Sequence, residues 1–77
     1  MNVERIGQAA GAVWTRLHNK GANGISFADL KKIPGYTADE SLAGLGWLAR
    51  EGKLTFKTDA TKKCVVSLVE EEIFATT

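Results

Sequence analysis

The first twenty positions carry apolar residues with the period of an α-helix. They fall in steps of three and four residues, at Val3, Ile6, Ala10, Val13 and Leu17. Such spacing places all five side chains on one face of a helix. Asn2 can cap the first turn, and Lys20 followed by Gly21 is typical of a helix end. The pattern therefore predicts a helix over residues 2–20.

A short extended stretch and a second helix follow. Ile25 begins the extended stretch after a glycine-rich turn. Ser26 and Asp29 then have the spacing of a capping box, although Glu or Gln is more usual at the second position. Pro34 ends this segment, because the residue before a proline avoids helical backbone angles. The expected helix covers residues 26–33.

The third helix has the clearest start signal in the chain. Thr37 and Glu40 have the spacing and residue types of a full capping box, and Gly52 marks the end, so a helix is predicted over residues 37–51. The expected buried face consists of Leu42, Leu45 and either Leu48 or Ala49. The expected outward positions are Asp39, Glu40, Ala43, Gly44 and Trp47.

Two glycines lie inside this third helix, at Gly44 and Gly46. Each costs roughly 1 kcal/mol relative to alanine in a helix interior, so each calls for a reason. One reason is a close crossing with another helix, where a side chain would collide. The other is a close approach of the backbone to a ligand. The crossing is the more ordinary of the two.

After Gly52 the apolar period changes from that of a helix to that of a strand. Residues 53–58 and 62–69 alternate, with a turn between them at 59–61, and together predict a β-hairpin over 53–69. The expected inward residues are Leu54, Phe56, Cys64, Val66 and Leu68. Residues 70–77 form an acidic tail that contains three consecutive glutamates.

Composition bounds the class of protein. A chain of 77 residues with 44% hydrophobic and 25% charged residues is expected to form one soluble domain over residues 1–77. The predicted fold class is α+β, because three helices packed on the hairpin would bury every apolar face. No segment has the length of a membrane span or the pattern of a signal peptide, which favours a cytoplasmic location.

Catalysis and metal binding are disfavoured by the residue inventory. The chain has one histidine, His18, and one cysteine, Cys64, in separate elements. These two side chains cannot supply a multi-ligand metal site, and no third group is implied for nucleophilic catalysis. No phosphate-binding glycine loop is present either. The sequence therefore predicts a protein that is not an enzyme and has no metal or other cofactor.

The order of elements resembles a winged helix-turn-helix domain. The resemblance rests on the helix at 26–33, the turn at 34–36, the helix at 37–51 and the run Leu45–Leu54, which leads from the third helix into the first strand. Two shorter runs, Ala10–Trp14 and Gly46–Gly52, are similar to a family of short, stand-alone bacterial winged-helix proteins whose function is not established. The resemblance implies a three-helix fold with a hairpin wing and a transcription-related role in binding double-stranded DNA.

The residues expected to contact DNA phosphates or the groove edge are Lys31, Lys32, Thr37, Ser41, Lys53, Lys57, Lys62 and Lys63. Other features point away from tight binding. The outward positions of the third helix hold no Arg, Lys, Asn or Gln, the side chains that usually read bases. A net charge of +1 and a pI near 7.9 are also low for a nucleic-acid-binding domain. Any DNA binding is expected to be weak and to depend strongly on salt.

The alternative is a protein-interaction or homodimerisation module with the same fold. The second strand is apolar on both faces, and two apolar residues follow the three glutamates, so a homodimer interface is predicted at Val65, Val69, Ile73 and Phe74. Trp14 is expected in the core. Trp47 is expected at the edge of the buried face, where an exposed indole would suit a protein partner.

Overall fold

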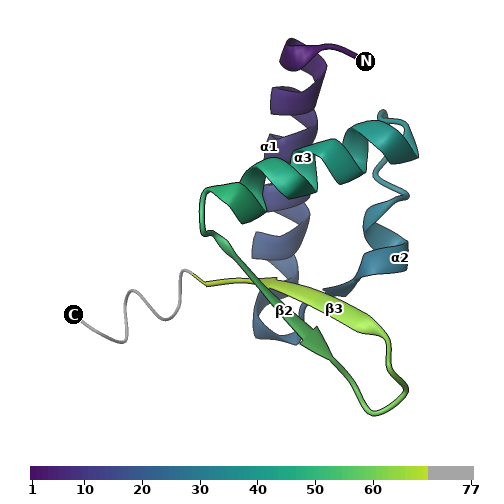
Figure 1. Ribbon diagram of the computed structural model, residues 1–77, viewed down its shortest axis with the longest axis vertical. Helices are drawn as coiled ribbons and strands as arrows, with labels where there is room; N and C mark the ends of the chain where they lie inside the picture. The colour runs from purple at the N-terminus through teal and green to yellow at the C-terminus, as the bar shows by residue number, and fades with distance from the viewer. Residues whose placement is uncertain (70–77) are drawn as a thin grey trace, which may run out of the picture.

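The computed structural model describes residues 1–69, and Figure 1 shows how its helices and strands are arranged. The elements are α1 (Val3–Lys20), η1 (Gly21–Asn23, a single 3-10 turn), β1 (Ile25–Ser26), α2 (Phe27–Leu30), α3 (Ala38–Arg50), β2 (Leu54–Thr58) and β3 (Cys64–Leu68). The predicted α+β class, three helices with a C-terminal hairpin, is confirmed. The predicted acidic tail at 70–77 lies outside the described residues.

Helix α1 has the predicted ends. The Asn2 side chain accepts a hydrogen bond from the backbone N–H of Arg5 at 2.8 Å, and Gly21 adopts a positive φ of 72° just after the last turn. Its buried face is carried by Ala9, Ala10, Val13 and Leu17. Val3, at the start of the predicted stripe, is exposed instead, because no other element covers the first turn of the helix on that side.

Helix α2 is shorter than the predicted 26–33. Ser26 caps it as expected, accepting from the Asp29 backbone N–H at 3.1 Å. The regular helix nevertheless stops at Leu30, and the next two backbone N–H groups bond three residues back, to Ala28 and Asp29. This tighter winding lets the chain turn before Pro34 without placing the residue before the proline in a helix.

Helix α3 is capped as predicted but buries a different face. Its buried residues are Glu40, Ser41, Gly44, Leu45 and Leu48, whereas Leu42 is half-buried and Ala49 is exposed. The expectation that Glu40 and Gly44 face outward was therefore wrong. Both lie against α1, which crosses behind α3 in Figure 1.

The two helices meet backbone to backbone at Gly44. A β-carbon at this position would lie 2.6 Å from the backbone nitrogen of Ala10 and 2.8 Å from the carbonyl carbon of Ala9. Gly44 is therefore the close crossing predicted from the sequence. A β-carbon at Gly46 would meet nothing within 4 Å, so no crossing explains this second glycine.

The sheet has three strands, in the order β1-β3-β2, with both pairs antiparallel. The extended stretch predicted at Ile25 forms β1, an edge strand of this sheet, in which Ile25 pairs with Val66 of β3. Gly24, at φ 72°, precedes it and lies so close to β3 that a β-carbon would be 2.6 Å from the Val66 carbonyl oxygen. This strand gives β3 a neighbour on each side and closes the sheet over the end of α1.

The core lies between the helices and the inner face of the sheet. Val66 and Leu68 of β3 are buried there with residues of all three helices. Phe56, which pairs directly with Val66 and so shares its face, is 47% exposed because the edge strand β2 extends past the helices. The predicted inward position of Phe56 holds for the face of the strand but not for burial. Trp14, expected in the core, is half-buried and stacks on the His18 ring at 4.8 Å.

The Gly44 crossing yields a testable pair of variants. Gly44→Ala forces a methyl group into the backbone of α1 and is expected to destabilise the protein by about 1–3 kcal/mol. At Gly46, two residues away in the same helix, an added methyl group meets open space. Gly46→Ala is therefore expected to raise the free energy of unfolding by about 0.5–1 kcal/mol. Urea unfolding followed by circular dichroism measures both. Equal effects of the two substitutions would contradict the crossing.

Candidate nucleic-acid interface

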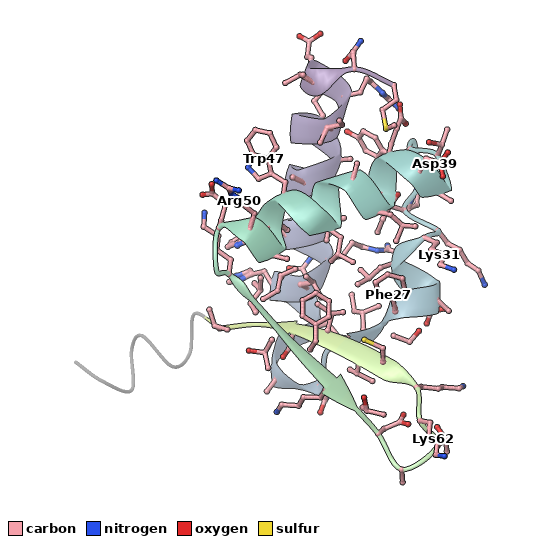
Figure 2. The ribbon with its side chains drawn as sticks, viewed as in Figure 1. Phe27, Lys31, Asp39, Trp47, Arg50 and Lys62 are labelled. Atoms are coloured by element: carbon pink, nitrogen blue, oxygen red, sulfur yellow. The ribbon has the colours of Figure 1, made fainter. Side chains whose placement is uncertain are left out.

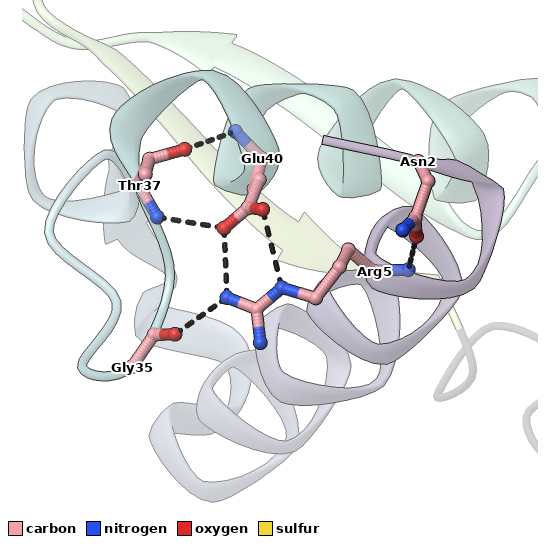
Figure 3. Close-up of polar contacts among 5 residues, drawn as sticks. All are labelled: Asn2, Arg5, Gly35, Thr37 and Glu40. Atoms are coloured by element: carbon pink, nitrogen blue, oxygen red, sulfur yellow. Dashed lines mark hydrogen bonds and ion pairs between the residues drawn. The ribbon is translucent and has the colours of Figure 1, made fainter.

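The start of α3 is held in place by a polar network with α1 (Figure 3). The Arg5 guanidinium donates to both oxygens of the Glu40 carboxylate, at 3.1 Å and 2.9 Å, and to the Gly35 carbonyl at 2.8 Å. Glu40 also accepts the Thr37 backbone N–H at 3.0 Å, and the Thr37 hydroxyl accepts the Glu40 N–H at 3.1 Å. The capping box predicted from the sequence is thus part of a larger contact between helices.

The network settles the charge of a carboxylate that is only 6% exposed. Hydrogen bonds from Arg5, and then from the Thr37 backbone, lower the pKa of Glu40 from 4.5 to about 2. The same guanidinium lies 4.5 Å from the centre of the Tyr36 ring, a cation–π contact. Glu40 therefore stays ionised and joined to α1 throughout the physiological range.

The wing presents four exposed lysines: Lys53, Lys57, Lys62 and Lys63. Lys57 pairs with Val65, so it shares the face of the sheet opposite the core. Lys62 and Lys63 lie in the loop between the strands, whereas the predicted second strand, 62–69, included both of them. Figure 2 shows Lys62 at the tip of the hairpin.

The Asp59 carboxylate organises this loop. It accepts hydrogen bonds from the Thr61 hydroxyl at 2.7 Å, the Thr61 N–H at 2.9 Å and the Lys63 N–H at 2.9 Å. These contacts, led by the Thr61 side chain, lower the pKa of Asp59. They also support the positive φ of 64° at Lys62, which is uncommon for a residue with a side chain. The loop lysines thus extend from a hydrogen-bonded turn.

The two lysines after α2 have different surroundings. The Lys31 ammonium lies 5.9 Å from the centre of the Phe27 ring, and Figure 2 shows this pair on the side of the molecule that also carries the wing. Lys32 lines a hollow with residues from the end of α1. The sequence analysis assigned both lysines to one DNA-contacting surface. In the structure, Lys31 lies over the Phe27 ring, whereas Lys32 lines the hollow beside α1.

The two predicted hydroxyl contacts also differ. Thr37 is exposed at the start of α3, and its hydroxyl oxygen already accepts from Glu40. Ser41 is fully buried, so its hydroxyl cannot reach a phosphate or a groove edge. The expectation for Ser41 was wrong because the α3 face that packs on α1 includes it. Within the described residues its hydroxyl has no hydrogen-bond partner.

The exposed surface of α3 is poor in groups that read bases. Its exposed residues are Ala38, Asp39, Gly46, Trp47, Ala49 and Arg50. Figure 2 places Asp39 at one end of the helix and Trp47 and Arg50 toward the other. Arg50, which sequence reasoning did not include, is the one exposed side chain here with the donors for a bidentate contact to guanine.

The predicted dimer residues are partly covered by their own chain. Val65 and Val69 are half-buried, and a β-carbon on Gly24 would lie 2.8 Å from a methyl group of Val65. The turn before β1 therefore lies against the strand face that the sequence analysis left without a partner. Ile73 and Phe74 lie outside the described residues.

Residues 1–69 hold no group of three or more His, Cys, Asp or Glu side chains placed to bind a metal ion. In the same range, no helix is both long and apolar enough to cross a bilayer.

The sequence matches the winged helix-turn-helix domain family DUF2582 over residues 1–67, and the chain belongs to this family. Its structure is similar to the solution NMR structure of protein BT2368 from Bacteroides thetaiotaomicron, with a TM-score of 0.75 and 25% sequence identity. The similarity covers 97% of this chain and 88% of that one. No curated protein matches the sequence. The resemblance stated from the sequence is confirmed.

The Arg5–Glu40 contact predicts a specific acid sensitivity. Because the pKa of Glu40 is lower in the folded protein than its ordinary value of 4.5, its stabilising effect is complete above about pH 5 and is lost as the pH falls toward 2. Glu40→Gln should therefore be less stable than the parent at pH 7, and the difference should shrink toward pH 2. Thermal unfolding at pH 7, 5, 4, 3 and 2 measures it.

A double-mutant cycle supplies the control for this prediction. In an Arg5→Ala background, Glu40→Gln should cost much less at pH 7, because the main partner of the carboxylate has been removed. A penalty for Glu40→Gln that does not change with pH, or that is the same in both backgrounds, would show that the ion pair does not hold α3.

Proposed function

We propose that this protein is a cytoplasmic, transcription-related DNA-binding protein that contacts the phosphate backbone of duplex DNA. The observation that carries the proposal is a family-defining winged helix-turn-helix fold whose wing carries four exposed lysines. Lys53, Lys57, Lys62 and Lys63 supply the cationic groups of the wing, while Lys31 and Thr37 add contacts beside α2 and at the start of α3. The proposal includes no catalytic step and no cofactor.

The proposed binding is largely independent of base sequence. Among the exposed positions of α3, Asp39 would repel phosphate, and Gly46 and Ala49 offer no side-chain hydrogen bond. Arg50 alone could contact a guanine edge, and it lies in the last turn rather than the first. Shape and backbone charge would therefore contribute most of the affinity.

The strength of the proposed binding follows from the number of lysines. Five lysine–phosphate contacts, four from the wing and one from Lys31, correspond to a slope of about −4.5 in a plot of log affinity against log salt concentration. Raising the salt from about 50 to 200 mM would then weaken binding by about 500-fold. A net charge of +1 adds little long-range attraction.

The test is an NMR titration of the ¹⁵N-labelled protein with a random-sequence duplex at the two salt concentrations. We expect shifts at the wing lysines and the start of α3 that weaken at the higher salt. Lys57→Gln with Lys62→Gln should reduce the slope to about −2.7. Lys57→Arg with Lys62→Arg keeps both positive charges at the same wing positions and should leave the slope unchanged.

Two outcomes would contradict the DNA proposal. One is an absence of shifts at the lower salt. The other is an unchanged slope in the Lys57→Gln, Lys62→Gln variant, because these wing lysines would then make no phosphate contact.

A second candidate function is contact with another protein chain, including a second copy in a homodimer. The observation that favours it is Trp47, 48% exposed, beside a largely apolar hollow of about 490 Å³ lined also by Ile6, Ala43 and Gly46. A large aromatic group next to an apolar hollow is typical of a protein-binding anchor.

Light scattering of the full chain in solution tests this second candidate. A homodimer should have twice the mass of the 77-residue chain at high micromolar concentration, and Trp47→Ser should shift it toward the monomer mass. Phe56→Ser, which removes an aromatic group of similar exposure from β2, is the matched control. A monomer mass for the parent protein at that concentration would contradict the homodimer.

A further inference from the structure

A second cationic surface lies at the opposite end of α1 from the Arg5 network. It is a hollow of about 660 Å³ between the end of α1, strand β1 and helix α2. We call it the α1–α2 hollow. The polar side chains that line it are Arg16, Asn19, Lys20, Ser26, Asp29 and Lys32. We propose that the α1–α2 hollow binds a phosphate group.

The three cations of the hollow are Arg16, Lys20 and Lys32, and they come from two separate parts of the chain. Arg16, Asn19 and Lys20 are spaced by three and four residues on α1, which places them on one face of that helix. Lys32 comes from the turn that follows α2, where the tight winding described above directs it to this side. The fold thus brings Lys32 to the two cations of α1, which precede it by at least twelve residues in the sequence.

Among residues 1–69, these cations have no carboxylate at ion-pair distance. The single ion pair among residues 1–69 joins Arg5 to Glu40, and it lies at the other end of α1. Asp29 is the one carboxylate that lines the hollow, and it lies within 4.0 Å of none of the three cations. Three like charges around one concavity are stabilised when an anion enters it.

The remaining groups fit a phosphate ester better than a bare halide or carboxylate. The Ser26 hydroxyl oxygen accepts from the Asp29 N–H, which leaves its hydrogen free to donate, and the Asn19 amide supplies a further donor. A phosphate has enough oxygens to accept from a guanidinium, an ammonium and these neutral groups together. Ile25, which is half-buried, also lines the hollow and offers an apolar surface to the organic part of a phosphate ester.

The hollow is built on a rigid element. Ser26 pairs with Val65 in the sheet, and Gly24 lies against the Val66 carbonyl in a conformation that a side chain would strain. The side of the hollow formed by β1 and the turn before it is therefore fixed by the same contacts that close the sheet. A site positioned in this way loses little freedom when a ligand binds.

The site is separate from the surface proposed to contact DNA. No residue of the wing lines the hollow, and Lys32 is the one position common to this site and to the DNA-binding residues expected from the sequence. A phosphate could come from a small phosphorylated molecule or from the backbone of a nucleic acid that extends around the protein. Both sources share the chemistry, and the experiment separates them.

The experiment is an NMR titration of the ¹⁵N-labelled full chain, with ionic strength held at about 150 mM by sodium chloride. One series adds inorganic pyrophosphate, a second adds adenosine 5′-monophosphate, and a third adds a 12-base-pair duplex. The amides of Gly24, Ile25 and Ser26 and the side-chain amide of Asn19 report on the hollow.

We expect saturable shifts at these reporters, half-complete at or below about 5 mM for pyrophosphate or the nucleotide. Arg16→Gln with Lys32→Gln should weaken this binding at least tenfold. Lys57→Gln, which removes a wing lysine, should leave it unchanged. If the duplex saturates the same reporters and the small molecules do not, the phosphate comes from a nucleic-acid backbone.

Three results would overturn the proposal. The first is shifts that grow linearly without saturation in all three series. The second is shifts of equal size at the wing lysines, which would indicate unspecific screening. The third is unchanged binding in the Arg16→Gln, Lys32→Gln variant.

Folding of that double variant is checked by the dispersion of its amide spectrum. Because Lys20 lies in the last turn of α1, where a cation also stabilises the helix end, it is left out of the double variant. Failure of these titrations leaves the wing-lysine test intact, since the two tests read different residues.

Discussion

The backbone contact between α1 and α3 at Gly44 is the constraint on which the rest of the structure depends. Because the helices approach without an intervening side chain, α3 can rotate so that Ser41, Leu45 and Leu48 face inward. That rotation also turns the Glu40 carboxylate toward α1, where burial would be costly without a cation. Arg5 supplies that cation, and its guanidinium joins the turn before α3 as well. The orientation of α3, and hence what it exposes, follows from this crossing.

The local elements could be predicted from the sequence because their signals are local. The Asn2 cap and the Thr37–Glu40 capping box involve residues three positions apart, and both are present as expected. The face that α3 buries could not be predicted in the same way. Leucine spacing favoured Leu42, Leu45 and Leu48, whereas the contact at Gly44 and the cation at Arg5, 35 residues from Glu40, decided the outcome.

For the candidate sites too, what depended on local signals was predictable and what depended on distant contacts was not. The exposure of Lys57 was predictable, since polar positions alternate with apolar ones along its strand, and Lys62 and Lys63 were expected near the tip of the hairpin. Ser41 was misplaced because its exposure depended on the rotation of α3. The α1–α2 hollow was missed, although the spacing of Arg16, Asn19 and Lys20 on one helix face was available as a signal. The sequence could not predict that Lys32 joins them, because its direction is set by the early end of α2.

Strand β1 has a consequence for how the chain is made. Ile25 pairs with Val66, and the buried Val66 and Leu68 complete a core whose other buried residues come from the first two-thirds of the chain. A ribosome synthesises the N-terminal helices first, yet the sheet that covers them cannot close until the last strand has left the exit tunnel. Contacts between residues so far apart in sequence also slow folding, since a long loop must be closed before they form. The apolar faces of the helices would therefore stay uncovered on the nascent chain until β3 has left the exit tunnel, so the N-terminal helices cannot complete this fold on their own.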